Sequence, residues 1–229
     1  MFRQTLFLCG LKIYAMRKFI FAFVLVVFST LFLQAQQVNS DLANEYKRKL
    51  GIKAGHNWSY LSGSTNGFNK DSKTGFMFGA FFAPASKGIG YRSEVIFSRQ
   101  GYSFEEGGKN TDVLNDYIYL PQLTTFTIAK KLQLQLGAQV GFLLNAKKSS
   151  AVKDTTITGL MNRIDYGFAG GVEIYPFKGL LVGGRYNLGL GKLYKRYEQA
   201  GSNPYPLPFN PENTDFKNGV VQLFVGYRF

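Results

Sequence analysis

The sequence predicts an all-β protein, an eight-stranded antiparallel up-and-down transmembrane β-barrel. Three observations lead to this fold class. Apolar and polar residues alternate with a period of two from residue 50 onward. The links between these segments alternate between long and short along the chain. After residue 35, no apolar run approaches the roughly 18 residues that a membrane helix needs, so a membrane-spanning mature chain must cross with strands.

The first 35 residues have the features of a secretory signal peptide. Residues 16–18 are a short basic segment, residues 19–33 are almost uninterruptedly apolar, and Ala35 offers a small residue for cleavage. An uncleaved signal anchor is the alternative, and Met16 is an alternative start because residues 1–15 make an unusual extension. We expect three parts: a signal peptide at 1–35, a periplasmic N-terminal segment at 36–49 and an outer-membrane barrel domain at 50–229.

Composition excludes several kinds of site. The single cysteine, Cys9, lies in the predicted signal peptide, so the mature chain would have no thiol, disulfide or cysteine-ligated metal. The formal net charge is +13, and removal of the four basic residues in the signal peptide leaves +9. These charges are scattered over predicted turns and loops without a nucleic-acid motif. We therefore expect no nucleic-acid partner, with attraction to anionic lipid headgroups as a secondary effect.

The clearest strand lies at residues 132–146. Leu132, Leu134 and Leu136 begin a set of seven apolar positions in one register, which requires about 14 residues of strand, whereas soluble strands usually have about 5–6. This length favours a tilted membrane strand over a soluble sandwich or a lipocalin-like barrel. The same period recurs in eight segments, in order: Leu50–Trp58, Thr74–Ala83, Ile89–Arg99, Tyr117–Ala129, Leu132–Ala146, Arg163–Tyr175, Gly179–Leu190 and Gly219–Phe229.

The links also carry information. Residues 59–73, 100–116, 147–162 and 191–218 form long links, and short ones separate them. An up-and-down barrel with both termini in the periplasm produces this alternation, because its outer loops are long and its periplasmic turns are short. Four of the seven prolines lie within residues 203–211, so this stretch cannot pair as a strand. It would form an extended arm that covers the barrel mouth or receives a partner.

The last strand ends on an aromatic residue. Tyr227 and Phe229 belong to its apolar face, which is expected to point outward. This arrangement resembles the C-terminal signal by which the barrel-insertion machinery recognises outer-membrane barrels during assembly. The alternative is a terminal strand that merely ends on Phe.

Five motifs together resemble a known family. They are Leu50–Ser59, Glu94–Gly101, Tyr119–Pro121, Arg185–Leu190 and Gly226–Phe229. In this order and spacing they are similar to the PorT-like outer-membrane β-barrel family of the Bacteroidota, over about residues 50–229. The resemblance implies an eight-stranded barrel in the outer membrane without enzymatic activity. The namesake of the family has been linked to protein secretion, but that role does not follow from membership.

The strand registers place a polar network inside the barrel. Eight strands enclose space only for their own side chains or one small ligand, and buried charges must be paired. We expect Arg92, Arg185 or Arg228 to neutralise Glu94 and Glu173. A narrow ion or solute pathway is the alternative to this closed lumen. The complete set of inward polar residues is Lys53, Arg92, Glu94, Gln133, Gln135, Gln139, Asp165, Glu173, Arg185, Asn187, Gln222 and Arg228.

Aromatic residues near the strand ends predict two interfacial girdles. The outer one would contain Trp58, Tyr60, Tyr102, Tyr117, Tyr119 and Tyr166, and the inner one Tyr91, Tyr175, Phe177, Tyr227 and Phe229. A carbohydrate- or protein-binding surface is the alternative for the loop residues Tyr60, Tyr102, Tyr194, Tyr197 and Tyr205.

No catalytic, cofactor or metal site is predicted. The only histidine, His56, lies three residues before Ser59, and such a pair points to opposite faces of a strand. Four acidic residues, Glu105, Glu106, Asp112 and Asp116, make the second outer loop acidic, and we expect a solvated loop there, with a weak cation site as the alternative. The sequence thus predicts a structural or interaction barrel surrounded by outer-membrane lipid, whose outer loops meet a protein partner. A solute channel or a secretion component is the alternative.

Overall fold

The computed structural model describes residues 50–63, 70–84, 88–106, 108–129, 131–149, 154–195 and 215–229. The predicted signal peptide, the predicted periplasmic segment, the proline-rich stretch, Tyr197 and Tyr205 lie outside these residues. No helix in the described part of the chain is long and apolar enough to cross a membrane.

The described residues form nine strands and one short 3₁₀ helix. In chain order these are β1 (Leu50–Ser62), β2 (Lys70–Phe82), β3 (Ile89–Glu106), β4 (Lys109–Ala129), β5 (Leu132–Ser149), β6 (Asp154–Thr156), η1 (Thr158–Leu160), β7 (Ile164–Ile174), β8 (Leu180–Gly189) and β9 (Lys217–Arg228). Each of the eight predicted strands overlaps one of the eight long strands.

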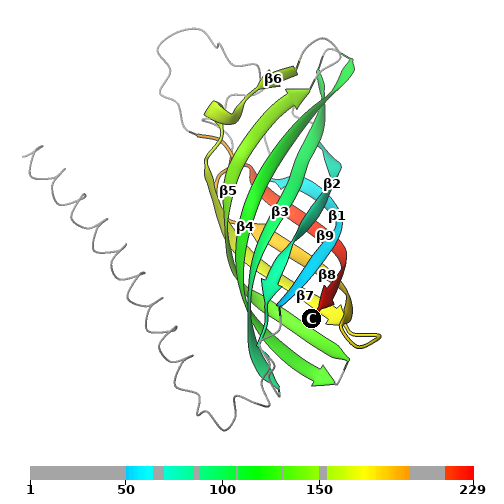
Figure 1. Cartoon of the computed structure of the whole chain (residues 1–229). Coiled ribbons are helices and arrows are strands. Elements are labelled where there is room, and N and C mark those ends of the chain that lie inside the picture. Colours follow the sequence, from blue (N-terminus) through cyan, green and yellow to red (C-terminus); the bar gives the residue numbers. More distant parts are fainter. Residues whose placement is uncertain are drawn as a thin grey trace, which may run out of the picture. The chain divides into compact units, whose positions relative to one another are not determined.

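The eight long strands form a closed antiparallel ring. Each pairs with its neighbour in the sequence, and β1 pairs with β9 from Gly51–Arg228 to Ser62–Lys217, which closes the barrel (Figure 1). The three-residue strand β6 is an addition that pairs with the end of β5. The predicted fold class, an eight-stranded antiparallel up-and-down barrel, is confirmed.

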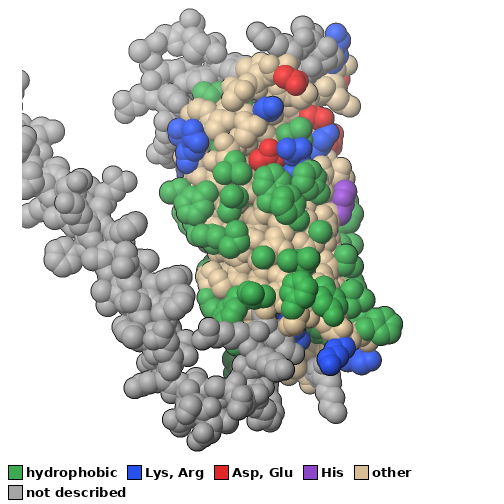
Figure 2. All heavy atoms as spheres, viewed as in Figure 1, with side chains coloured by type: hydrophobic (Ala, Val, Ile, Leu, Met, Phe, Trp, Pro, Cys, Tyr) green, Lys and Arg blue, Asp and Glu red, His purple; other side chains and the backbone are tan. Residues whose placement is uncertain are grey.

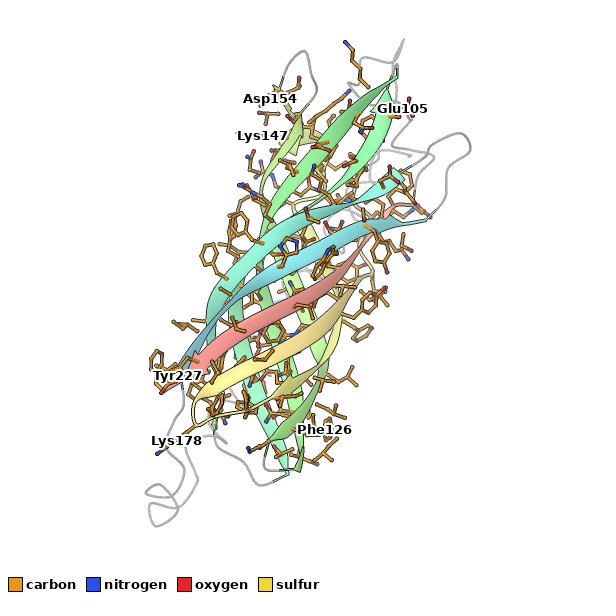
Figure 3. All side chains as sticks on the ribbon, turned by 90° about the vertical axis from the view of Figure 1, so that its right-hand side faces the viewer. Glu105, Phe126, Lys147, Asp154, Lys178 and Tyr227 are labelled. Carbon is orange, nitrogen blue, oxygen red and sulfur yellow. The ribbon has the colours of Figure 1, made fainter. Side chains whose placement is uncertain are left out.

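The two ends of the barrel differ. The terminus end carries Leu50 and Phe229, and the hairpin end carries the β3–β4 connection. Figure 3 shows Glu105, Lys147 and Asp154 near the hairpin end, and Phe126, Lys178 and Tyr227 near the terminus end. The strands β3, β4 and β5 extend furthest at the hairpin end (Figure 1).

The prediction of a long loop at residues 100–116 is wrong. The strands β3 and β4, with 18 and 21 residues, continue as a ladder as far as the pair Glu106–Lys109, and Gly108 takes a positive φ of 74° in the turn. The ladder persists because alternate residues beyond the expected strand ends, among them Tyr102 and Val113, still point inward and are buried. The predicted loop 147–162 likewise contains β6 and η1.

The outer surface carries an apolar belt. Figure 2 shows hydrophobic side chains around the middle of the visible face, with charged side chains toward both ends. The belt arises because alternate residues of every strand point outward, and these are mostly apolar. Typical members are Ile52, Phe78, Val95, Leu136, Phe168, Val172, Val182, Leu188, Leu223 and Val225.

Glycine allows aromatic rings to lie flat inside the barrel. Tyr119 faces Gly141 across the β4–β5 pair, and a Cβ on this glycine would lie 2.3 Å from a Tyr119 ring carbon. Phe81 faces Gly51 in the same way, with a distance of 2.2 Å. Aromatic rings placed over glycines of a neighbouring strand are a recognised means of packing and fixing register in β-sheets.

This close packing predicts a specific sensitivity at Gly141. Gly141→Ala should destabilise the barrel by about 1–3 kcal/mol, because the added methyl group displaces the Tyr119 ring in a filled interior. The urea midpoint of heat-modifiable gel migration measures the effect. Gly159→Ala is the matched control, since nothing lies within 4 Å of a Cβ at that position. Equal midpoints for the two variants would contradict the packing argument.

Candidate functional site: the closed lumen

A charged cluster fills the lumen toward the terminus end. Lys53 Nζ donates to both carboxylate oxygens of Glu94 at 2.8 Å. Arg185 donates to the same two oxygens through Nη1 at 2.6 Å and Nη2 at 2.9 Å. These side chains come from β1, β3 and β8, and they are almost completely buried. One carboxylate therefore joins three strands that lie apart around the ring.

The second half of the cluster is centred on Arg92. Its Nη1 donates to Glu173 at 2.5 Å, and its Nη2 donates to Tyr175 at 2.8 Å and to Gln133 at 3.2 Å. The Tyr175 hydroxyl in turn donates to the other oxygen of Glu173 at 2.8 Å. The two halves meet where Arg92 Nη1 lies 3.7 Å from Glu94. We call Lys53, Arg92, Glu94, Glu173 and Arg185 the ion cluster.

Aromatic rings lie against the ion cluster. The Arg92 guanidinium is 4.5 Å from the centre of the Phe81 ring, and Lys53 Nζ is 4.3 Å from that of Phe224. A ring face is electron-rich and attracts a cation, most strongly where water is excluded. The rings thus stabilise the cations and fill the space beside them. The sequence did not single out Phe81 or Phe224 for this role.

Two members of the predicted network lie elsewhere. Arg228 is half-buried at the end of β9, with its guanidinium 4.5 Å from the centre of the Tyr175 ring, and it forms no ion pair with Glu94 or Glu173. Asp165 precedes Glu173 by eight residues in β7, which corresponds to about 26 Å of strand. It accepts hydrogen bonds from Tyr119 at 2.8 Å and Asn218 at 3.3 Å. Both side chains face inward, but their heights in the barrel keep them out of the ion cluster.

A layer of uncharged polar side chains lies further along the lumen. Asn57 donates to Ser98 Oγ at 2.9 Å and to the Arg99 carbonyl oxygen at 3.1 Å, and it accepts from Gln222 at 3.1 Å. Gln100 also donates to Ser98, at 2.9 Å. These hydrogen bonds connect β1 to β3, past the intervening β2, and to its paired neighbour β9.

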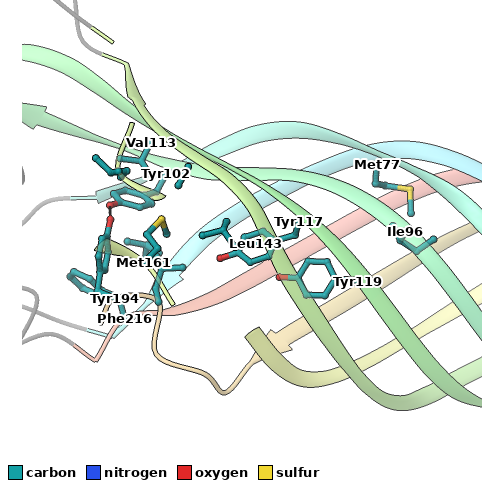
Figure 4. Close-up of a cluster of buried hydrophobic side chains, with 14 of the residues drawn as sticks. Met77, Ile96, Tyr102, Val113, Tyr117, Tyr119, Leu143, Met161, Tyr194 and Phe216 are labelled. Atoms are coloured by element: carbon teal, nitrogen blue, oxygen red, sulfur yellow. Dashed lines mark hydrogen bonds between the residues drawn. The ribbon is translucent and has the colours of Figure 1, made fainter. Parts of the chain in front are cut away.

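An apolar plug occupies the hairpin end. Its members are Tyr102, Phe104, Val113, Ile157, Met161, Leu193, Tyr194 and Phe216, all nearly or completely buried. Figure 4 shows Tyr102, Val113, Met161, Tyr194 and Phe216 gathered at one end of the cluster, with Leu143, Tyr117 and Tyr119 continuing toward the middle of the barrel. The hydroxyls of Tyr102 and Tyr194 form a hydrogen bond to each other. Residues that follow β5 and β8 thus belong to the apolar cluster at this end.

Part of the predicted aromatic girdle is wrong. Tyr102, Tyr117 and Tyr119 are buried inside the barrel, and Tyr175 points its hydroxyl into the ion cluster. Tyr194, which was considered for a binding surface on a loop, is buried in the plug. The physical reason is that β4 carries large side chains on both faces, so alternation alone cannot tell inside from outside. The remaining members are exposed on the outer surface: Trp58, Tyr60, Tyr91, Tyr166, Phe177, Tyr227 and Phe229.

The side chains considered for catalysis do not meet. His56 points outward, with its ring centre 4.7 Å from that of Trp58. Ser59 points inward and is buried, and its hydroxyl donates to the Gly101 carbonyl oxygen at 2.9 Å while accepting from the Gly101 amide at 2.8 Å. The two groups are therefore on opposite faces of β1, as the spacing predicts.

The acidic residues expected in a solvated loop lie on strands instead. Asp112 accepts hydrogen bonds from Lys73 and Ser103, and Asp116 forms a two-contact pair with Arg99 at 2.7 and 3.0 Å. Desolvation by itself would raise the pKa of Asp112, but the hydrogen bonds from Lys73 and Ser103 lower it below its ordinary value. Across the described ranges, no three His, Cys, Asp or Glu side chains are placed to hold a metal ion.

Comparisons with known proteins agree with this architecture. The model of the family described as outer membrane protein beta-barrel domain matches residues 34–195, well over half of the chain. The match does not show membership of the PorT-like family. A search of curated proteins found no match.

Among solved structures, the chain is similar to the attachment invasion locus protein Ail of Yersinia pestis. The identity is 21% and the TM-score 0.47, over 80% of this chain and 99% of Ail. Neisserial surface protein A has 16% identity and a TM-score of 0.49, over 79% of this chain and 97% of its own. OprG from Pseudomonas aeruginosa has 11% identity and a TM-score of 0.42, over 80% and 97%. Likenesses at this level assign no role to the chain.

The ion cluster predicts a large cost for removing one partner. Glu94→Gln should destabilise the barrel by about 3–5 kcal/mol, because Lys53 and Arg185 would remain buried without their shared carboxylate. Asp116→Asn, which breaks a partly exposed pair on the outer face, should cost less than about 1 kcal/mol. Urea unfolding followed by intrinsic fluorescence measures both variants. Similar costs for the two would show that the ion cluster does not hold the strands together.

Proposed function

The chain belongs to the outer membrane protein beta-barrel domain family, and from its closed lumen we propose that this member is a non-conducting, non-enzymatic barrel that acts through its outer loops. Family membership makes it an outer-membrane β-barrel protein. The observation that carries the proposal is closure of the interior at two separate levels, by the ion cluster and by the apolar plug.

Two buried layers in the described part of the barrel support an interior without a continuous polar path along its axis. The paired charges of the ion cluster are bound to one another from opposite walls, so a passing ion would have to break several buried charged hydrogen bonds. In the plug, Tyr102, Phe104 and Phe216 contribute buried aromatic rings, and the buried Lys148 places its Nζ 5.7 Å from the centre of the Phe104 ring. An eight-stranded ring offers no room to bypass either layer.

The hairpin end supports an interaction role. The β3–β4 hairpin projects beyond the apolar belt as a continuous ladder, so it is a rigid element rather than a loose loop. The Arg99–Asp116 and Lys73–Asp112 ion pairs on its outer face connect it internally and to β2. A rigid edge that projects from the membrane provides a contact surface for a protein partner at little entropic cost.

The proposal also includes the PorT-like group, the C-terminal insertion signal and the orientation in the membrane. The motifs at Leu50–Ser59 and Arg185–Leu190 support a place in the PorT-like group, and with it an association with protein secretion as the alternative role. Tyr227 and Phe229 stand exposed with ring centres 5.5 Å apart, which supports their use as the C-terminal insertion signal. Both chain termini would lie in the periplasm, with the hairpin end outside the cell.

Conductance in planar lipid bilayers tests the closed lumen. The wild-type barrel should insert without stepwise conductance. Combining Arg92→Ser, Glu173→Ser and Tyr102→Ser removes one buried ion pair together with a ring of the plug, and it should produce discrete steps. Heat-modifiable migration confirms that the variant is folded. Steps of similar size from the wild-type protein would overturn the proposal and favour a channel.

Cysteine labelling tests the orientation. The mature chain is expected to have no cysteine, so Asn110→Cys at the hairpin tip and Lys178→Cys in the β7–β8 turn each introduce a single thiol. A membrane-impermeant maleimide should label Asn110→Cys in intact cells and Lys178→Cys only after lysis. The reverse pattern would place the hairpin in the periplasm and exclude it as a cell-surface contact.

A further inference from the structure

The ion cluster carries one positive charge more than its carboxylates neutralise. Lys53, Arg92 and Arg185 face only Glu94 and Glu173, and all five side chains have a relative exposure of 0–1%. The remaining lumen carboxylate, Asp165, is about 26 Å of strand from Glu173 and binds Tyr119 and Asn218. Within the described ranges, no other acidic side chain forms an ion pair with the cluster. Burying a charge without a partner costs free energy, so a negative counter-charge beside the cluster would stabilise the folded barrel.

The same cluster contains unpaired hydrogen-bond donors. Arg92 Nε, Arg185 Nε and Gln135 Nε2 are buried and have no partner in the described structure. They belong to one assembly, because Arg185 Nη2 donates to Gln135 Oε1 at 2.6 Å and both arginines approach Glu94. All three unpaired atoms are N–H donors, and none is an acceptor.

The uncharged part of the lumen shows a different pattern. There the unpaired atoms are Gln100 Oε1, Asn115 Oδ1, Asn115 Nδ2 and Asn187 Oδ1, three acceptors and one donor. Water can serve such a mixed set, because it both donates and accepts. A set of donors alone, beside an excess positive charge, requires a ligand that accepts hydrogen bonds and carries negative charge.

We propose that the ion cluster binds a small inorganic anion of halide size, held by Arg92, Arg185 and Gln135. Such an anion would accept the three unpaired N–H groups and neutralise the excess charge at the same time. A monatomic anion suits the site because an eight-stranded interior holds little beyond its own side chains or one small ligand, and the rings of Phe81 and Phe224 lie against the two arginines here. The proposal does not depend on the role suggested for the outer hairpin.

Halide-dependent stability tests the site. The barrel is unfolded by urea in detergent at constant sodium concentration while sodium gluconate is replaced by sodium chloride or bromide. Above the dissociation constant, each tenfold rise in halide should lower the apparent unfolding constant about tenfold, because the anion binds only the folded state. A wild-type response no larger than that of a variant without the site would overturn the proposal.

Two variants remove the need for the anion. Gln135→Glu replaces an unpaired donor with a carboxylate beside Arg185, and Lys53→Met removes the excess charge. Both should lose the halide response while staying folded. The matched controls are Gln139→Glu, four residues along the same inward face of β5, and Lys73→Met on the outer face. Both controls should keep the wild-type response, which separates binding at this site from a general effect of salt.

Bromide diffraction tests the same site without substitution. Crystals of the wild-type barrel grown with sodium bromide should show an anomalous peak beside Arg92, Arg185 and Gln135. Loss of a proton from Lys53 would also balance the charge, and it predicts neither the peak nor the halide response. The absence of both would therefore overturn the proposal.

Discussion

Pairing of charge inside a narrow ring is the constraint on which the rest of this structure depends. Eight strands leave room for side chains and little else, so inward residues pack against residues from other strands of the ring. Glu94 satisfies this constraint by binding Lys53 and Arg185 from two other strands, and Glu173 does so through Arg92. The contacts that neutralise these groups also fix the relative heights of β1, β3, β7 and β8. The same ion pairs therefore neutralise the buried charges and fix the strand register.

The same confinement shapes the remaining interior. Large rings fit only where the neighbouring strand presents glycine, as Tyr119 does over Gly141 and Phe81 over Gly51. Toward the hairpin end, Tyr194 and Phe216 come from chain outside the long ladders and complete an apolar plug. The interior therefore contains two chemically different buried layers. Activity at the outer surface, rather than passage through the interior, is the role that such a closed barrel supports.

The hairpin end shows how far local pairing extends beyond the membrane belt. Outward apolar residues give way to the Arg99–Asp116 and Lys73–Asp112 pairs, while the inward face of the hairpin continues with buried Tyr102 and Val113. The hairpin is ordered by an apolar interior that it shares with the plug. A partner that meets this edge would encounter a preformed surface.

The period of two in the sequence determined the fold class, the number of long strands and the inward face that carries Arg92, Glu94, Glu173 and Arg185, because alternation depends only on local backbone geometry. Which of the inward charged side chains pair with each other was decided only by the tertiary structure. Arg228 and Asp165 face inward as expected, yet they lie too far along their strands to join the ion cluster. Alternation along a strand gives the face on which a residue lies, but it does not give the position of that residue along the barrel axis.

Strand β4 shows a second limit of prediction from sequence. Both of its faces are rich in large side chains, so its inward face could not be chosen from alternation, and only pairing with β3 and β5 turned Tyr117 and Tyr119 inward. The length of the β3–β4 ladder was likewise decided by cross-strand pairs and by the plug, which no single segment of the sequence contains.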